Sequence, residues 1–248
     1  MQIEADYFHR ARSFDAALDR LAEATHTLGF DAVDYGFMAR AREPDGRYNA
    51  PDIAWRNWPA RVESGWSRYA RVDPFLYAGY PRTLPLDWQQ VKGASWLSQM
   101  QKEALCYVED IGICDGLTVP IHLPGGAFAF VTAVTHRGHG GWRERQPQVT
   151  DRLFVMAHEF HAAVAPRLGL HAEGRPRDTK LSPRECEMLV HAAAGLSAPA
   201  SARRVQRSVE TVRRQRKSAM EKLGAHTVTQ AVALAMQRGL LESPRPAP

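Results

Sequence analysis

The sequence predicts an α+β protein in which an N-terminal domain with an antiparallel sheet precedes an all-α domain of four short helices. A hairpin signal supports the sheet, because Pro124-Gly125-Gly126 joins two strand-like runs at 118–123 and 127–135. Four closely spaced amphipathic patterns after residue 180 support the helical domain. The segment between the two domains is rich in proline, glycine and charge, as linkers are. We therefore divide the chain into residues 1–165, a linker at 166–178, and residues 179–248.

The N-terminal domain is predicted to be an α/β/α sandwich, with helices on both faces of the sheet. Apolar side chains from Phe14 to Leu28 recur at helical spacing, and Gly29 follows as a helix stop. Residues 30–39 alternate as a strand does, whereas residues 42–58 are polar and rich in turn formers. Further helices are expected within 60–80, interrupted at Asp73-Pro74, over 95–108, and over 153–164.

The bulk composition indicates a cytoplasmic protein. Its 248 residues, 44% of them hydrophobic, are enough for packed cores in two domains. No apolar run reaches ~18 residues, so we expect neither a transmembrane helix nor a membrane partner. Residues 1–10 lack the apolar core of a secretion signal. The three cysteines, Cys106, Cys114 and Cys186, have no metal-binding spacing and are expected to be reduced core thiols.

The net charge of +5 is unevenly distributed along the chain. Residues 179–248 hold 12 Lys and Arg against 5 Asp and Glu, a balance of +7. The preceding 178 residues hold 20 against 22, a balance of −2. A basic domain tied to a near-neutral one is typical of nucleic-acid binding. Together with the helix pattern described next, it predicts double-stranded DNA as a partner.

The caps and cations of the C-terminal domain predict a helix-turn-helix. Ser182-Pro183 is a helix start, Gly195 is a helix stop, and Ser208 caps the third helix. On that third helix Arg213 and Lys217 are four residues apart and project together. A short cationic helix held by a preceding helix fits the major groove, where Lys and Arg neutralise phosphates and Arg reads guanine. The alternative is a solvated cationic helix without a nucleic-acid partner.

Residues 181–241 resemble the DNA-binding domain of the LuxR family. The shared positions are Leu181 to Glu185, Leu189, Gly195, Thr211-Val212, Lys222 to Gly224, Thr229 to Ala233 and Gly239 to Leu241. The resemblance implies that Arg213 and Lys217 contact bases and that the helix around 227–236 forms a homodimer. It also implies RNA polymerase as a further partner. The DNA-contact residues that we predict are Arg207, Thr211, Arg213, Arg214 and Lys217.

Three positions depart from the LuxR pattern in this domain. Ala200 and Ser201 stand where the family has an acidic residue and an isoleucine, and Arg207 replaces an apolar residue. Smaller and more polar side chains at these positions are expected to weaken the packing of the second helix.

The first 165 residues resemble the autoinducer-binding domain of quorum-sensing LuxR proteins. The shared motifs are Leu28 to Asp31, Tyr35-Gly36, Asn57-Trp58-Pro59, Tyr69 to Pro74, Pro85 with Trp88, and Gly116 to Pro120. The resemblance implies an α/β/α sandwich that holds an N-acyl homoserine lactone between the sheet and the helices. It also implies a transcription regulator rather than an enzyme.

The residues themselves also point to an apolar binding site in this domain. Eight aromatic side chains crowd the stretch from Trp58 to Trp96, and Asp73 lies among them. An aromatic wall with a carboxylate suits an amphiphilic amide, whose N–H the carboxylate accepts. Alternatively, the aromatics are ordinary core and Asp73 caps the turn at Pro74. The predicted ligand-binding residues are Trp58, Val62, Trp66, Tyr69, Asp73, Phe75, Trp88 and Thr132.

The predicted site departs from the family at two hydrogen-bond donors. Val62 stands where the family has a Trp that donates to the lactone carbonyl, and Trp66 where it has a Tyr that donates to the amide carbonyl. Losing a donor against a buried carbonyl costs about 1–3 kcal/mol. The change at Trp66 resembles the plant-associated LuxR solos, which respond to plant-derived molecules. We therefore favour a non-lactone amide over an acyl homoserine lactone as the signal, and we expect no other cofactor.

Two other functions share parts of this pattern. Response regulators carry the same C-terminal domain and are phosphorylated on their first domain, but residues 30–130 lack the strand–helix alternation of a receiver. An enzyme with a DNA-binding tail needs a catalytic constellation, and the sequence offers no convincing one. His158 and His161 are three residues apart, whereas the helical zinc-protease motif needs four. We interpret them as packed helix residues and expect no metal.

Overall fold

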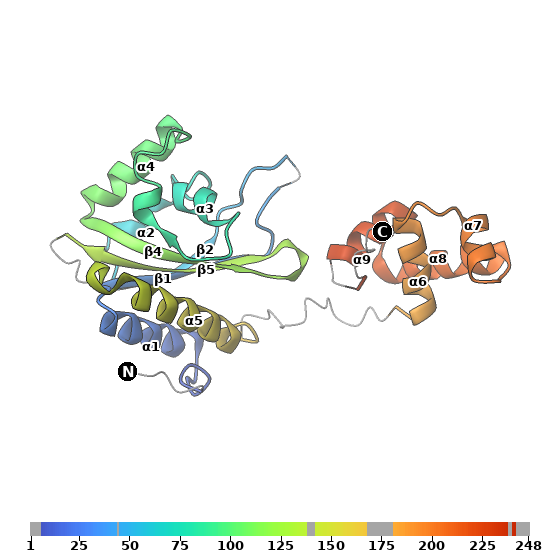
Figure 1. The fold of residues 1–248 in the computed structure, drawn as a ribbon, viewed down its shortest axis with the longest axis horizontal. Coiled ribbons are helices and arrows are strands. Elements are labelled where there is room, and N and C mark those ends of the chain that lie inside the picture. The colour runs from blue at the N-terminus through green and yellow to red at the C-terminus, as the bar shows by residue number, and fades with distance from the viewer. Residues whose placement is uncertain (1–5, 44, 138–141, 168–180, 238–239, 242–248) are drawn as a thin grey trace. The chain divides into compact units, whose positions relative to one another are not determined.

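The chain folds into two compact units, Met1–Ala172 and Glu173–Pro248, in a computed structural model. The structure describes residues 6–43, 45–137, 142–167, 181–237 and 240–241. Within these residues the first unit is a five-stranded antiparallel sheet with helices on both faces, and the second is a group of four helices (Figure 1). The predicted α+β fold class is confirmed. The predicted linker lies outside the described residues from residue 168 on.

The sheet has the strand order β2-β1-β5-β4-β3, and each neighbouring pair is antiparallel. Its strands are β1 Ala32–Met38, β2 Asp52–Arg56, β3 Leu86–Asp87, β4 Ile113–His122 and β5 Phe128–His136. β4 and β5 form the predicted hairpin. Its turn places Gly125 and Gly126 at φ of 76° and 81°, a conformation that only glycine adopts without strain.

Helices cover the two faces of this sheet (Figure 1). α1 Phe14–Thr27 and α5 Gln146–Val164 lie together on one face, whereas α2 Val62–Trp66, α3 Pro74–Gly79 and α4 Gln99–Asp110 lie on the other. Because side chains alternate along a strand, β1 and β5 present one set of residues to each helical layer. The sandwich therefore has two interiors with different chemistry.

The interior between the sheet and α1 and α5 is a conventional hydrophobic core. Leu21 and Phe160 are fully buried there, and Tyr35 packs edge-on against Phe160 with ring centroids 5.3 Å apart. The Tyr35 hydroxyl is hydrogen-bonded to His161 Nδ1 at 2.9 Å, and burial together with the nearby His158 lowers the pKa of His161. His161 is thus a packed helix residue with a polar partner.

Two strands lie in segments where the sequence predicted none. β2 falls within residues 42–58, which we expected to be polar turns, and this edge strand pairs Trp55 with Asp34. Its residues follow a run of turn formers and are exposed or half-buried, so they carry little hydrophobic signal. β3 has only two residues and pairs Leu86 with Thr118. Such short edge strands depend on the neighbouring strand rather than on their own pattern.

The second unit has the predicted helix-turn-helix arrangement. Its helices are α6 Pro183–Ala193, α7 Ala198–Arg204, α8 Val209–Leu223 and α9 Val228–Gln237. Ser182, Ser197 and Ser208 cap the first three, each accepting a hydrogen bond from a backbone N–H of the first turn. The turn from α7 to α8 has Gln206 at φ 52°, a left-handed conformation that is uncommon outside glycine. It brings the fully buried Val212 of α8 against Ala202 of α7.

A buried carboxylate ties α6 to α8. Glu185 is 5% exposed and accepts hydrogen bonds from the Ser182 backbone at 2.6 Å, Ser218 Oγ at 2.7 Å and Lys222 Nζ at 2.8 Å. Burial raises the pKa of Glu185, but these hydrogen bonds outweigh it and lower the pKa to about 2. Glu185 therefore both completes the capping box of α6 and holds the long helix of this unit.

Candidate ligand cavity and nucleic-acid interface

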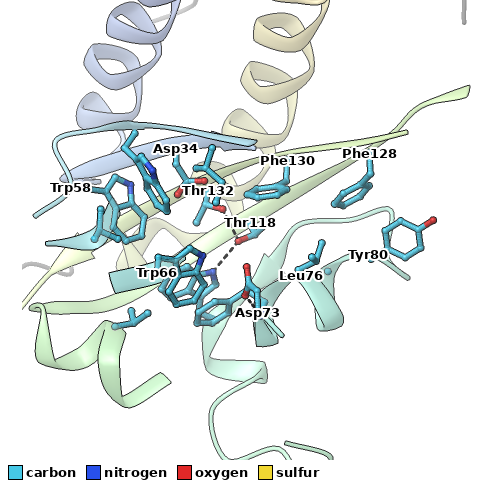
Figure 2. A pocket seen from close by; sticks show the side chains of 17 residues that line it. Asp34, Trp58, Trp66, Asp73, Leu76, Tyr80, Thr118, Phe128, Phe130 and Thr132 are labelled. Atoms are coloured by element: carbon cyan, nitrogen blue, oxygen red, sulfur yellow. Dashed lines mark hydrogen bonds between the residues drawn. The ribbon is translucent and has the colours of Figure 1, made fainter. Parts of the chain in front are cut away.

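A cavity lies between the sheet and the layer of α2 and α3 (Figure 2). The cavity volume is about 30 Å³, so the cavity is narrow. Seven of the eight predicted ligand-binding residues line it: Trp58, Val62, Trp66, Asp73, Phe75, Trp88 and Thr132. They come from helices, strands and the loops between them, which are far apart in sequence.

The eight aromatic side chains between residues 58 and 96 do not all line the cavity. Five of them do: Trp58, Trp66, Phe75, Tyr80 and Trp88. Tyr69, which we predicted as a ligand residue, does not line the cavity; it packs against Trp66 and Tyr107 with ring centroids 6.0 and 5.7 Å apart. Trp96 is 49% exposed and belongs to neither the wall nor the core.

The sequence missed the cavity residues that the sheet contributes. Asp34 of β1, Trp55 of β2, Thr118 of β4 and Phe130 of β5 line it beside Thr132. The remaining lining residues are Ile53, Leu76, Gly79, Val108 and Phe128. Trp55 was not found because it lies in β2, a strand that the sequence did not predict. Asp34 carried a usable signal, because an acidic side chain at the centre of a hydrophobic strand is rare without a function or a partner.

Three lining side chains form a hydrogen-bond chain across the sheet. Trp88 Nε1 donates to Thr118 Oγ1 at 3.0 Å, and Thr118 and Thr132 hydroxyls are 3.1 Å apart (Figure 2). An indole N–H only donates, so Trp88 is the donor at the start of this chain. Thr132, at its other end, lies near the Asp34 carboxyl and lowers the pKa of Asp34.

Two carboxyl groups lie in this otherwise apolar space. Asp73 is 6% exposed, and its Oδ1 accepts the Phe75 N–H at 2.8 Å as the N-cap of α3. Burial raises the pKa of Asp73 to about 7, although the backbone hydrogen bonds oppose this. Burial, and then the charge of Asp73, raise the pKa of Asp34 well above its usual range. Asp73 therefore caps the turn, as one of the two sequence interpretations expected, and it also faces the cavity.

The wall of the cavity offers apolar surface and a buried donor. Phe75 and Trp88 stack with ring centroids 3.7 Å apart and planes 14° apart. Trp58 Nε1 is buried without a hydrogen-bond partner among the described residues. Val62 and Trp66 are nearly fully buried and line the wall without any hydroxyl group. Such a site can bury an aliphatic or aromatic ligand body, while the Trp58 N–H donates to an acceptor on the ligand.

None of the three cysteines lines this cavity. Cys106 is exposed and Cys114 is half-buried, so the expectation of core thiols is wrong for these two, whereas the half-buried Cys186 packs against the core of the second unit. Cys106 lies on the outer side of the amphipathic helix α4, where a small residue tolerates solvent. Among the described residues, no cluster of His, Cys, Asp and Glu has a geometry that could hold a metal ion. Nor does any described helix combine the length and apolarity needed to span a membrane.

In the second unit, helix α8 presents cations to solvent. Arg213, Arg214 and Lys217 are exposed along it, and Arg207 is exposed just before it. Arg213 and Lys217 face the exposed acids Glu210 and Glu221 on the same helix at 4.0 and 3.9 Å. Exposed pairs of this kind are worth only about 0.3–0.5 kcal/mol, so both cations are available to phosphates or bases.

The N-terminal end of α8 adds groups that suit a phosphate. Ser208 caps the helix, and Thr211 is half-buried with its hydroxyl 2.8 Å from Ser208 Oγ. Arg203 and Arg207 border a shallow surface depression that Ser208 and Thr211 also line. The structure thus places all five predicted DNA-contact residues, Arg207, Thr211, Arg213, Arg214 and Lys217, on α8 or directly before it.

Arg216 differs from the other cations of α8, because it points into the domain. Its guanidinium donates to Leu196 O and to Ser201 Oγ, each at 2.9 Å. Ser201 is fully buried in α7, at one of the positions where we expected a polar residue to weaken packing. The structure supplies that hydroxyl with a partner, so the polar side chain is not left unsatisfied.

An aromatic-walled cavity with buried carboxyl groups in one unit and an exposed cationic helix of a helix-turn-helix in the other are the features of a ligand-binding transcription factor. Comparison with known families agrees. Residues 13–164 match the autoinducer binding domain, and residues 179–235 match the bacterial regulatory proteins of the luxR family. The chain therefore belongs to the LuxR-type autoinducer-binding transcriptional regulators, and it is not an enzyme.

Individual relatives cover most of the chain. It is 26% identical to the transcriptional activator protein BjaR1 of Bradyrhizobium diazoefficiens, over 93% of this chain and 91% of that one. It is 28% identical to the transcriptional activator protein VanR of Vibrio anguillarum, over 71% and 70%.

Solved structures share the fold. The crystal structure of Escherichia coli SdiA matches with a TM-score of 0.65 and 20% identity over 95% of both chains. The N-acylhomoserine lactone dependent factor CepR2 of Burkholderia cenocepacia matches with a TM-score of 0.52 and 20% identity, over 66% of this chain and 93% of that one.

Proposed function

We propose that this protein is a cytoplasmic homodimer that binds a small acyl amide signal in the cavity and regulates transcription through α8. The observation that carries the proposal is a buried carboxyl, Asp73, which faces a narrow aromatic-walled cavity. A carboxylate in such a place binds a ligand N–H through a charge-assisted hydrogen bond worth about 1.5–3 kcal/mol. Binding then stabilises the folded N-terminal unit.

The chemistry of the cavity supports a non-lactone signal. Val62 and Trp66 bring no hydroxyl group to the positions where the family has donors for the lactone and amide carbonyls. Among proteins of this fold, CepR2 is described as N-acylhomoserine lactone dependent, and SdiA has been solved with octanoyl-rac-glycerol. The fold therefore holds acyl ligands both with and without a lactone ring, and side chains decide between them.

Tryptophan fluorescence tests the ligand site directly. All six tryptophans precede residue 143, and Trp55, Trp58, Trp66 and Trp88 line the cavity. We expect saturable quenching and a higher unfolding temperature with members of a panel of acyl amides, octanoyl glycerol and acyl homoserine lactones. Trp96→Phe removes an exposed emitter and is the matched control. A panel that leaves both signals unchanged at millimolar concentration would contradict the proposal.

For DNA, we propose that Arg213 and Lys217 contact bases while Arg207, Thr211 and Arg214 contact the backbone. The supporting observation is the exposed cationic side of α8 beside its serine-capped N-terminus. The homodimer would form through α9, where Met236 is 43% exposed, and RNA polymerase is the further partner that an activator needs. Selection from random duplexes, followed by sedimentation of the complex, tests both the operator and the dimer.

The antiparallel sheet argues against regulation by phosphorylation. A receiver domain needs a parallel sheet with an acidic cluster at its strand ends, whereas each neighbouring strand pair described in this protein is antiparallel. We therefore propose the ligand, not a phosphoryl group, as the signal.

A further inference from the structure

We propose that Asp34 is a second ligand-binding carboxylate opposite Asp73, and that the cavity therefore selects a signal with a protonated amine in addition to an amide N–H. The inference rests on the proposed function, because it names the ligand class for the same cavity.

Asp34 faces the cavity from the middle of the sheet. It pairs with Trp55 of β2 on one side and with Thr132 of β5 on the other. Its two chain neighbours in β1 belong to the opposite core, so strand alternation directs Asp34 into the cavity. Figure 2 shows Asp34 on the sheet side of the cavity and Asp73 on the helix side.

A negative charge at Asp34 needs compensation. Asp34 is 3% exposed, and removing an ionised carboxylate from water is costly unless it is paired. Asp73 is near enough for its charge to raise the pKa of Asp34. The Thr132 hydroxyl offsets this only in part, because it is a neutral donor at the end of the hydrogen-bond chain that starts at Trp88.

The cavity itself supplies no counter-charge. Its described lining contains two carboxyl groups and no Lys, Arg or His. A ligand ammonium brings one positive charge and three N–H donors, so it can supply Asp34 with the counter-charge that the lining lacks. An acyl homoserine lactone offers one amide N–H and no charge, so it can satisfy Asp73 but leaves Asp34 with Thr132 alone. The pair of acids therefore favours an amine-bearing amide.

Two matched probes isolate the amine. One is octanamide with an aminoethyl group on its nitrogen, and the other carries a propyl group, which replaces the ammonium by a methyl of similar size. Both keep the same acyl chain and amide N–H. Octanoyl homoserine lactone is the third ligand. Tryptophan quenching and calorimetry on the full-length protein measure all three dissociation constants.

We expect the aminoethyl probe to bind about tenfold or more tightly than the propyl probe, since a charge-assisted pair replaces an apolar contact. A propyl probe that binds as tightly as the aminoethyl probe, or more tightly, overturns the inference and leaves the proposed function intact. If none of the three ligands binds, the proposed function fails as well. This comparison uses the natural protein, so it does not depend on the folding of a variant.

Substitution then assigns the preference to Asp34. Asp34→Asn keeps the shape and removes the charge, so we expect it to abolish the aminoethyl preference while changing propyl binding by no more than about twofold. Asp73→Asn should weaken both probes, because both present the amide N–H. Thermal unfolding followed by tryptophan emission shows that each variant is folded. An undiminished aminoethyl preference in folded Asp34→Asn would refute the role of Asp34.

Discussion

Arg216 of α8 donates a hydrogen bond to the buried hydroxyl of Ser201 in α7 at 2.9 Å. A second bond from the same guanidinium reaches Leu196 O, in the turn that precedes α7. Burial lowers the pKa of Arg216, which marks it as an internal residue among the exposed cations of the helix. One arginine thus fixes how α8 crosses α7, while its neighbours remain available to DNA.

Arg216→Ala is expected to destabilise the helix-turn-helix rather than to remove a DNA contact. It leaves the buried Ser201 hydroxyl without its donor, which costs about 1–3 kcal/mol. Hydrogen exchange of α7 and α8 amides in the full-length protein measures this loss, since the tryptophans all lie in the other unit. Arg214→Ala, an exposed neighbour, is the control and should keep native protection. Equal protection in both variants would show that Arg216 is not structural.

Arg213→Ala and Lys217→Ala should weaken DNA binding without lowering stability. Each residue is exposed and held only by a long ion pair within α8, so its loss leaves the fold unchanged. A lost base contact costs about 1–3 kcal/mol and relaxes the preference at one operator position. Fluorescence anisotropy with operator and scrambled duplexes measures both effects. Arg184→Ala, which removes an exposed cation from α6, should bind like the natural protein.

The sequence predicted the parts of the fold whose signal is local. The structure contains the predicted caps at Ser182 and Ser208 and the glycine turn of the β4–β5 hairpin. It also has helices α1 and α5 where the apolar spacing predicted them. Strands β2 and β3 were missed because their stability comes from pairing with β1 and β4, which no local pattern reveals. Which strands pair across the sheet depends on residues that are far apart in the sequence.

The candidate site shows the same division. The residues between Trp58 and Trp88 were found because they crowd one stretch of sequence and share motifs with a family. Asp34, Thr118 and Phe130 were not found, since only the strand register brings them beside Thr132 and the helix layer. Asp34 matters most among them, because a single missed carboxyl changes the inferred ligand from a neutral amide to a cation.

Glu185 should make the stability of the C-terminal unit sensitive to acid. Its pKa is lowered to about 2 in the folded state, from a usual value of 4.5. A lowered pKa adds stability above the unfolded value, and that stability is lost as the pH falls from about 4.5 toward 2. The shift corresponds to about 3 kcal/mol at neutral pH. Hydrogen exchange of α6 and α8 at pH 7 and pH 3 measures it. Glu185→Gln should be less stable at pH 7, with a difference about half as large at pH 3. A difference that stays constant with pH would count against this account.

Trp66→Tyr is expected to shift the ligand preference toward lactones. A phenol at this position of the wall restores a hydroxyl donor for an amide carbonyl, a bond worth about 0.5–1.5 kcal/mol. We therefore expect octanoyl homoserine lactone to bind the Trp66→Tyr variant up to about tenfold more tightly than it binds the natural protein.

Calorimetry checks this, with Tyr69→Phe as the control because Tyr69 packs against Trp66 and lies outside the cavity. Unchanged or weaker lactone binding in a folded Trp66→Tyr variant would show that the hydroxyl is not what the cavity lacks.

Gly36 and Phe130 test whether the shape of the cavity controls binding. They face each other across β1 and β5, and a Cβ on Gly36 would lie 2.1 Å from the Phe130 ring. Gly36→Ala must therefore push that ring toward the cavity that it lines, which costs about 1–3 kcal/mol in stability and reduces ligand affinity.

Replacing Phe130 by Leu in the same chain makes room for the new methyl group. We expect this double variant to recover most of the unfolding temperature and part of the affinity, as a strongly non-additive pair does. Additive losses in tryptophan-monitored unfolding and in calorimetry would mean that the two residues act independently.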